Sequence, residues 1–204
     1  MKEYPSIEAL PGPIAGNYYV FDKLDGSNIR AEMSKKLVFN KFGKRHGLLD
    51  DSYPILRRSE ELINDKYTDM IAMLMKKNKW ENVTCFFEFL GPSSFAGWHN
   101  PDEQQDVILL DIWIHKRGFI EPKELVKVIG EEFLPRLLSV GNVTKPIIEQ
   151  VSNGTLPGMS FEGIVVKGPY NKKTGMLDSY KWKNIAWLKK LKEKVTPEEY
   201  EKLK

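Results

Sequence analysis

The chain has 204 residues, of which 41% are hydrophobic and 29% charged, as is ordinary for a globular protein of one large or two small domains. Its 31 basic and 28 acidic residues leave a net charge of +3, which permits nucleic-acid binding through a local patch without demonstrating it. A single cysteine, Cys85, excludes intrachain disulfides and a cysteine metal cluster, and no stretch reads as a signal peptide or a membrane span. We therefore expect a soluble, cytoplasmic protein in a reducing compartment.

A strand that ends in a bend is predicted near the start of the chain. Residues 4–16 are rich in proline and glycine, which favours an extended or looped lead-in. The apolar residues 18–21 predict a strand that carries Lys23 toward a core. Gly26 would then let the backbone turn and come close to a ligand. A surface lysine beside a hairpin turn is the alternative, because Asp-Gly is a strong hairpin signal.

The next elements are a meander and a helix. We expect an antiparallel meander formed by residues 28–33, 37–40 and 41–47, with basic residues at one end. A basic loop of this kind is usually just solvated. Between positions 59 and 80, apolar residues recur at steps of three and four, which predicts an amphipathic helix. Its methionines are most simply explained by core packing.

Two predicted strands each hold one acid within an apolar run. Glu88 lies within residues 83–92, and Asp111 lies within residues 107–114. A buried carboxylate is costly unless it is paired, hydrogen-bonded or used. One such acid is often structural, whereas two on neighbouring strands indicate a site.

The C-terminal half alternates helices and strands. A second helix is expected from Glu121-Pro122 to Leu138, interrupted at Pro135, and a short one at 145–150 that is closed by Asn153-Gly154. Residues 161–168 predict a strand, and residues 179–184 a strand with lysines on one face and aromatics on the other. Residues 185–204 predict a charged amphipathic helix. The fold class is therefore α+β, with antiparallel sheets flanked by helices.

Six stretches, in this order, resemble the motifs of the covalent nucleotidyltransferases, the superfamily of ATP-dependent polynucleotide ligases and mRNA-capping enzymes. They are residues 23–28 (KLDGSN), 44–47 (KRHG), 87–92 (FEFLGP), 109–112 (LLDI), 162–167 (EGIVVK) and 181–183 (KWK). Each one alone is weak, but six in order and in strand contexts are a strong signal. Asn28 and the second and third stretches look most like the phage RNA ligase 2 type, because DNA ligases and capping enzymes usually carry arginine at the place of Asn28.

The resemblance implies an adenylation domain whose sheets form a nucleotide pocket, and a three-step reaction. A lysine attacks the α-phosphate of ATP, the adenylate moves to a nucleic-acid 5′-phosphate, and a 3′-hydroxyl displaces AMP. Lowering a lysine pKa from about 10.4 to about 7.5 takes roughly 4 kcal/mol, which nearby cations and desolvation can supply. We expect Lys181, Lys183 and a bound Mg²⁺ (or Mn²⁺) to be those cations.

The resemblance also assigns roles to single residues. The catalytic group is Lys23, which would carry AMP, together with Asp25, Lys181 and Lys183. Glu162 would bind or orient the metal. The residues expected to contact the nucleotide are Asp22, Asn28, Arg45, Glu88 (ribose), Leu110, Val165 (adenine), Lys167 (phosphate), Lys181 and Lys183. Asp111 would tune the site. Lys167 at a strand end and Asp111 as a backbone cap are the structural alternatives, and His46 and His99 are expected to be loop residues without metal-ligand spacing.

Two departures from the family pattern affect the expected function. Leu110 stands where RNA ligases carry an aromatic residue that stacks on adenine, so Trp113 is a second candidate for covering the base. Only residues 184–204 follow the two-lysine motif, so we expect one adenylation domain over residues 1–204 without an oligonucleotide-binding barrel.

The expected function is an ATP-dependent RNA ligase that seals RNA ends or nicked duplexes with a 5′-phosphate and a 3′-hydroxyl. We expect it to act as a monomer away from membranes, with weak or partner-dependent end-joining. The alternatives are a minimal DNA ligase with the same first step and a catalytically silent RNA-binding relic.

Overall fold

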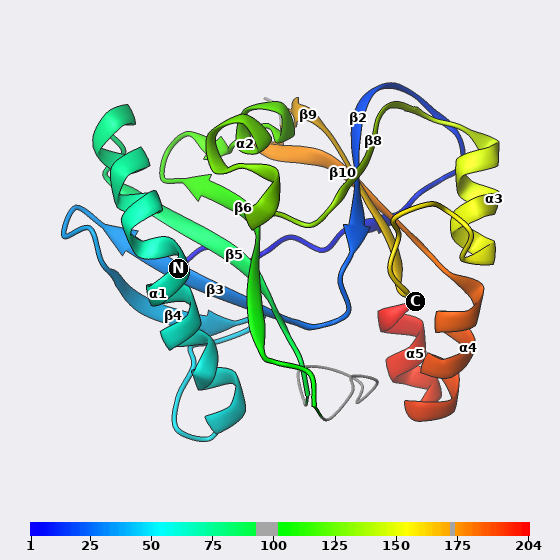
Figure 1. The fold of residues 1–204 in the computed structure, drawn as a ribbon, viewed down its shortest axis with the longest axis horizontal. Helices are drawn as coiled ribbons and strands as arrows, with labels where there is room; N and C mark the ends of the chain where they lie inside the picture. The colour runs from blue at the N-terminus through cyan, green and yellow to red at the C-terminus, as the bar shows by residue number, and fades with distance from the viewer. Residues whose placement is uncertain (93–101, 172–173) are drawn as a thin grey trace.

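The fold is built on two five-stranded β-sheets (Figure 1). The computed structural model describes residues 1–92, 102–171 and 174–204, without the side chain of Lys202. Within them, every strand pair is antiparallel except the parallel pair of β1 and β10. In spatial order, the first sheet contains β1 (Glu8–Ala9), β10 (Met176–Lys183), β9 (Gly163–Asn171), β2 (Ile14–Lys23) and β8 (Leu137–Val143). The second contains β4 (Phe39–Lys44), β3 (Ser27–Ser34), β5 (Asn82–Leu90), β6 (Asp106–Ile114) and β7 (Gly118–Phe119).

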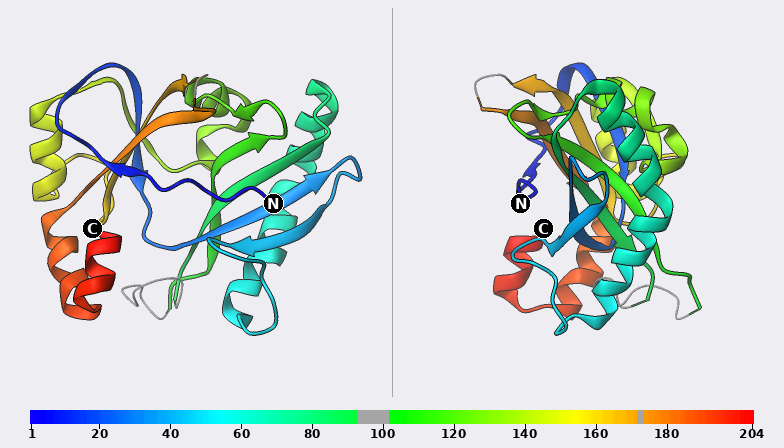
Figure 2. Two further views of the ribbon diagram at one scale, coloured as in Figure 1. Left: turned by 180° about the vertical axis from the view of Figure 1, so that it is seen from behind. Right: turned by 90° about the vertical axis from the view of Figure 1, so that its left-hand side faces the viewer.

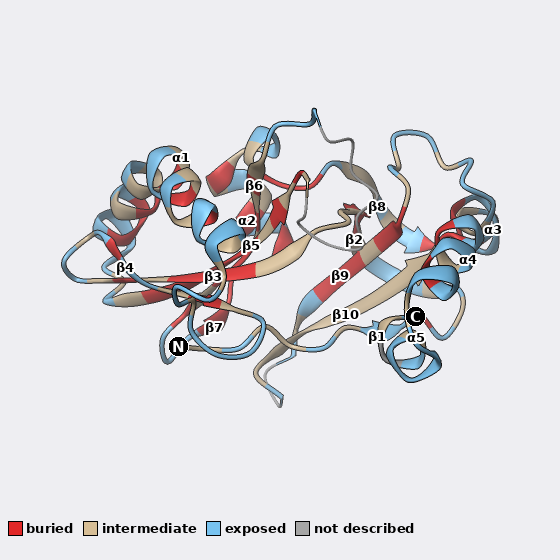
Figure 3. Ribbon diagram, turned by 90° about the horizontal axis from the view of Figure 1, so that it is seen from below, coloured by how far each residue is buried: buried red, intermediate tan, exposed pale blue. Residues whose placement is uncertain are grey.

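Each sheet buries one face under a helix. The long helix α1 (Pro54–Asn78) covers the second sheet and contributes Ile63, Tyr67 and Ile71 to the larger core. Helix α3 (Lys145–Asn153) contributes Ile148 and Val151 to a smaller core on the first sheet. Buried residues accordingly line the strands, while the outer helix faces are exposed (Figure 3). The expected α+β class is confirmed.

The remaining helices are short. They are α2 (Pro122–Ile129), a 3₁₀ turn (Glu131–Phe133), α4 (Ile185–Lys194) and α5 (Pro197–Leu203). In the described residues, no helix has the length and apolarity needed to cross a membrane. The short helix predicted before Asn153-Gly154 is confirmed as α3, and Gly154 ends it in the left-handed conformation.

Two helices predicted from the sequence are wrong in extent. The helix expected from Glu121 to Leu138 ends at Ile129, and Leu137 already pairs with Phe21 of β2. The single helix expected over residues 185–204 is two helices, because Pro197 begins a new one that Thr196 caps with its side chain.

The bend after Lys23 joins the two sheets. Strand β2 belongs to the first sheet and β3 to the second, so the hairpin interpretation of Asp25-Gly26 is wrong. Gly26 is required for a close approach, but to protein rather than to a ligand: a Cβ there would lie 2.4 Å from the carbonyl oxygen of Phe89.

The meander expected after the bend has two strands, β3 and β4. The sequence analysis expected two elements between residues 37 and 47, but the structure has the single strand β4 there.

The N-terminal segment also connects the sheets. Its start is held by Arg30 of β3, whose guanidinium donates to the carbonyl oxygen of Lys2 (3.0 Å) and approaches Glu3 (3.6 Å). Its end, β1, pairs with β10 of the first sheet. The segment therefore runs from the second sheet to the first (Figure 2).

Candidate active site

A cavity of about 620 Å³ lies between the two sheets. Asp111, which is expected to tune the site, is not among its lining residues, but every residue expected to be catalytic, to contact the nucleotide or to bind a metal lines it. The set is Asp22, Lys23, Asp25, Asn28, Arg45, Glu88, Leu110, Glu162, Val165, Lys167, Lys181 and Lys183. These residues come from six strands and three loops between Asp22 and Lys183, so the fold rather than local sequence brings them together.

The strand register of the first sheet explains how its lysines share one face. Lys23 of β2 and Lys183 of β10 both pair with Gly163 of β9, from opposite sides. Two residues along, Phe21 and Lys181 both pair with Val165. Since alternate residues of a strand point to the same face, these side chains form one surface on the cavity.

Lys23 and Lys183 share one carboxylate oxygen. Glu162 Oε1 lies 2.9 Å from the Nζ of each lysine. The side chain of Lys23 remains 22% exposed, whereas those of Glu162 and Lys183 are only 5% and 7% exposed. This arrangement defines one end of the cavity, which we call the phosphate end because it collects the lysines.

The charges at the phosphate end shift the lysine pKa values in opposite directions. Burial lowers the pKa of Lys23, but the carboxylates of Glu162 and Glu88 outweigh it and raise the pKa above the usual 10.5. Burial and the nearby Lys23 lower the pKa of Lys181. Burial, together with the charge of Lys23, lowers the pKa of Lys183 to about 8 even though Glu162 opposes the shift. The expectation that the neighbouring cations lower the pKa of Lys23 is therefore not met in the chain alone.

Helices α4 and α5 close over the phosphate end. Trp187 of α4 donates from Nε1 to Asp25 Oδ2 (3.1 Å), and its ring lies 3.8 Å from Lys183 Nζ. Lys183 Nζ also donates to the carbonyl oxygen of Leu203 in α5 (2.6 Å). Asp25 is thus oriented by the indole, and Lys183 is held by three groups.

Asp22 lines the cavity but directs its carboxylate at a loop. Its Oδ1 accepts from the backbone N (2.8 Å) and Oγ (3.0 Å) of Ser160. Because Ser160 stands two residues before Glu162, Asp22 fixes the segment that presents Glu162. The structure therefore gives Asp22 a positioning contact in addition to the expected place beside the nucleotide.

The other end of the cavity is lined by less polar groups, and we call it the base end. Leu110, Phe21 and Val165 lie there. Lys167 is also there, four residues along the sheet from the register of Lys23, which is about 13 Å at the usual strand rise. Its Nζ donates to Asp111 Oδ2 and to the carbonyl oxygen of Leu110, each at 2.8 Å. The ammonium of Lys167 is therefore buried in an ion pair with Asp111, and its expected contact with a phosphate stays a prediction.

The second sheet supplies the opposite wall. Asn28 donates from Nδ2 to the carbonyl oxygen of Phe87 (3.4 Å), while its Oδ1 is a buried acceptor without a hydrogen-bond partner in the described residues. Burial raises the pKa of Glu88, its cross-strand neighbour, to about 8, although Lys23 opposes the shift. Arg45 is exposed at the rim, where Nη2 donates to Ser6 Oγ (3.3 Å).

Several residues at the site were missed in the sequence. Tyr4, Trp187 and Leu203 line the cavity, and Ser160 holds Asp22. Tyr4 donates its hydroxyl to Asp111. Tyr4, Trp187 and Leu203 are single apolar or aromatic residues outside the six motif stretches, so nothing in the nearby sequence indicates that they line a cavity. Among the other candidates, His46 lines the cavity from the loop after β4, Trp113 is not among the cavity-lining residues, and His99 lies outside the described residues.

The carboxylates at the cavity suit a metal ion that binds together with nucleotide phosphates better than one that the protein holds alone. Within residues 1–92, 102–171 and 174–204, no group of three or more His, Cys, Asp or Glu side chains is placed to hold an ion. Mg²⁺ is commonly bound by one or two carboxylates, water and substrate phosphates. Glu162 at the phosphate end fits that mode.

Similarity to solved structures is found at the level of the fold. The chain matches an archaeal ATP-dependent RNA ligase at a TM-score of 0.62 and 14% identity, over 92% of this chain and 50% of that one. A putative ATP-dependent DNA ligase from Aquifex aeolicus matches at a TM-score of 0.60 and 17% identity, over 99% of this chain and 57% of that one. Naegleria gruberi RNA ligase with PPi matches at a TM-score of 0.55 and 21% identity, over 87% of this chain and 52% of that one. The chain has the fold of ATP-dependent polynucleotide ligases.

This ligase fold accounts for only part of each matched protein. The chain spans about half the length of these solved structures. Two other structures of the Naegleria gruberi enzyme are of variants, one with AMP and Mn and one with ATP and Mn. No family model matches the sequence, and no curated protein matches it.

Proposed function

We propose that the chain is the adenylation domain of an ATP-dependent RNA ligase, with Lys23 as the nucleophile that carries AMP. The observation that carries the proposal is the phosphate end: Lys23 and Lys183 meet on one oxygen of Glu162. A cavity of about 620 Å³ beside it is in the size range of small-molecule sites and ends in apolar side chains that suit a base.

The first step follows from the arrangement of the lysines. Of the three protons on the Lys23 ammonium, one leaves to water before the attack, and a second leaves to water after the new N–P bond forms. As that bond forms on the α-phosphorus, the bond to the β-phosphate oxygen breaks and pyrophosphate departs with its electron pair. Lys181 and Lys183 supply positive charge where negative charge develops on the phosphate.

Glu162 forms ion pairs with both Lys23 and Lys183. While its oxygen binds Lys23, the raised pKa keeps the amine protonated and unreactive. Transfer of Glu162 to another cation would remove that restraint on Lys23. Glu162, with water and the nucleotide phosphates, would hold Mg²⁺ or Mn²⁺, which would add positive charge at the α-phosphate.

RNA is the proposed nucleic acid because Asn28 and the stretches 44–47 and 87–92 resemble the phage RNA ligase 2 type. The fold alone is common to RNA and DNA ligases. We further propose that residues 1–204 act as one monomeric adenylation unit in a reducing compartment such as the cytoplasm. Its end-joining would depend on salt or on a helper protein, since a net charge of +3 offers few phosphate contacts.

Label transfer tests the proposal. The purified chain is incubated with α-labelled ATP, and separately with GTP, and we expect an acid-labile, alkali-stable adduct with ATP. Lys23→Ala and Lys23→Arg should abolish it, whereas Lys145→Ala, at an exposed ion pair on α3, should leave it intact. A folded wild-type chain that takes up no label would instead favour the silent relic, and an adduct on Lys23→Ala would assign the nucleophile elsewhere.

A second assay addresses the polynucleotide. Nicked duplexes with either RNA or DNA on the 3′-hydroxyl side are offered to the adenylated chain across a salt series. Faster sealing of the RNA end supports the proposal. Preference for the DNA end would favour the minimal DNA ligase, for which the fold shared with the Aquifex aeolicus protein is the specific observation.

A further inference from the structure

Leu110 reaches the cavity because β6 contains an extra residue. Phe86 of β5 pairs with Asp111, and the next residue, Phe87, pairs with Leu109, which leaves Leu110 between the two pairs. Such a bulge bends the strand and redirects a side chain. Here both the side chain of Leu110, which lines the cavity, and its carbonyl oxygen, which accepts from Lys167, lie at the base end.

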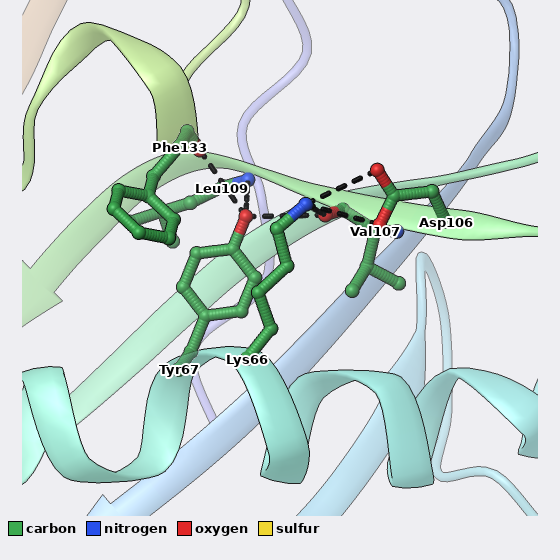
Figure 4. Close-up of polar contacts among 6 residues, drawn as sticks. All are labelled: Lys66, Tyr67, Asp106, Val107, Leu109 and Phe133. Carbon is green, nitrogen blue, oxygen red and sulfur yellow. Dashed lines mark hydrogen bonds and ion pairs between the residues drawn. The ribbon is translucent and has the colours of Figure 1, made fainter.

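The hydroxyl of Tyr67 binds the backbone beside this bulge (Figure 4). It accepts from the backbone N of Leu109 (3.2 Å) and lies 3.1 Å from the carbonyl oxygen of Val107 and 3.2 Å from that of Phe133. Tyr67 belongs to α1, is fully buried, and packs edge-on against the ring of Phe87 at 5.0 Å. One side chain thus ties α1 to β6 and to the 3₁₀ turn.

The three contacts are not equivalent. A hydroxyl has one proton, so Tyr67 can donate to only one of the two carbonyl oxygens at a time. Val107 has a second donor, since Lys66 Nζ lies 3.1 Å from the same oxygen and 3.0 Å from Asp106. The Leu109 contact is the one next to the bulge, so it couples Tyr67 to the position of Leu110.

We propose that Tyr67 is a positioning residue for the nucleotide base: it holds the β6 bulge so that Leu110 faces the cavity. The inference rests on the proposed function, because it assigns the base end to adenine. Tyr67 itself lies on the α1 side of the second sheet, is not among the cavity-lining residues, and acts through Leu110.

The test is single-turnover labelling of Tyr67→Phe across ATP concentrations. Losing one hydrogen bond at the bulge should raise the half-saturating ATP concentration about 3- to 10-fold and leave the maximal rate nearly unchanged. Tripolyphosphate, which has no base, should inhibit the variant and the wild type equally. Lys66→Met is the matched control, because it removes a neighbouring contact to Val107 but none to Leu109.

Two further measurements separate positioning from general loosening. Leu110→Ala should abolish the effect of Tyr67→Phe, so the double variant should resemble Leu110→Ala alone. If Tyr67→Phe does not fold, 3-fluorotyrosine at position 67 keeps the shape and weakens the acceptor, and a smaller rise is expected.

The results distinguish failure of the inference about Tyr67 from failure of the proposed function. An unchanged half-saturation in the folded variant, or an equal loss of tripolyphosphate inhibition, overturns the inference while leaving the proposed function standing. A wild-type chain that is not labelled at all overturns both.

Discussion

At the scale of single residues, two lysines share one carboxylate oxygen yet have opposite pKa shifts. Lys23 is surrounded by Glu162, Glu88 and Asp25, whose charges raise its pKa. At Lys183, burial and the charges of Lys23 and Lys181 outweigh the opposing charge of Glu162, so its pKa falls to about 8. The chain alone therefore keeps the proposed nucleophile charged and weakens the charge of the lysine beside it.

This difference predicts an order of amine reactivity. At pH 8, about half of Lys183 is neutral, whereas Lys23, whose pKa is raised above the usual 10.5, is protonated. A small acylating reagent should therefore modify Lys183 before Lys23 in the nucleotide-free chain, as measured by peptide mass spectrometry. Glu162→Gln should accelerate modification of Lys23 and leave that of the exposed Lys145 unchanged. Faster reaction of Lys23 in the wild type would contradict the pKa order.

The second residue-scale prediction concerns Leu110. An aliphatic side chain lacks the roughly 0.5–1.5 kcal/mol that a well-placed aromatic pair adds beyond buried area. Leu110→Phe should therefore lower the half-saturating ATP concentration a few-fold in labelling assays, provided that the base end admits the ring without overpacking. Leu110→Met, which lengthens the side chain at nearly constant volume and adds no ring, is the control. If both variants behave alike, stacking is not the missing contribution.

At the scale of elements, several strands and the end of α3 could be predicted, whereas the ends of α2 and α4 could not. Most motif residues fall in the strands expected for them, because those stretches combine an apolar run with a charged residue that has one suitable face. Residues 44–47 have no apolar run and lie at the end of β4 and in the loop after it. Leu137 and Leu138 fit a helical period equally well, and only pairing with β2 makes them a strand. Pairing over more than 100 residues leaves no local signal.

The site shows the same division. Lys23, Glu162 and Lys183 could be predicted because their motifs resemble a known family. The roles of Ser160, Trp187 and Tyr67 depend on hydrogen bonds to partners that are distant in the sequence. The separations along the chain are 138 residues for Ser160, 162 for Trp187 and 42 for Tyr67. The buried ion pair of Lys167 with Asp111 likewise follows from sheet register, which is not visible in the sequence.

Helix α5 gives an element-scale prediction. Thr196 accepts from the backbone N of Glu199, whose side chain bonds back to Thr196 in a capping box. Thr196→Ala should cost about 0.5–2 kcal/mol of local stability. Amides of α5 should then exchange faster with solvent, by hydrogen-exchange mass spectrometry, while those of α4 around Leu191 stay protected. Equal exchange in both proteins would show that packing, not the cap, holds α5.

At the scale of the whole molecule, one carboxyl between the sheets should control part of the pH dependence of stability. The folded pKa of Glu88, about 8, lies above its usual 4.5, so the folded chain binds more protons than the unfolded chain between these values. The contribution is fully present below about pH 4.5 and is lost as the pH rises through 8. The lowered pKa of Lys183 acts in a separate window above pH 8.

Glu88→Gln isolates this effect. From pH 5 to pH 8, the wild type should lose free energy of unfolding relative to Glu88→Gln, as measured by urea denaturation at each pH. Glu81→Gln serves as the control, because Glu81 forms an exposed ion pair with Lys35 just outside the strands of the same sheet. A constant difference between wild type and Glu88→Gln would mean that the Glu88 carboxyl is ionised throughout the range.

The contact between Lys183 and α5 has a consequence for how the domain responds to anions. An ammonium has three N–H donors, and those of Lys183 face Glu162, the carbonyl oxygen of Leu203 and the ring of Trp187. An incoming phosphate oxygen can bind Lys183 only by displacing one of these three. Where Leu203 is the partner displaced, anion binding and α5 docking compete for a single ammonium. Since such competition is reciprocal, α5 weakens anion binding by the same factor by which an anion loosens α5.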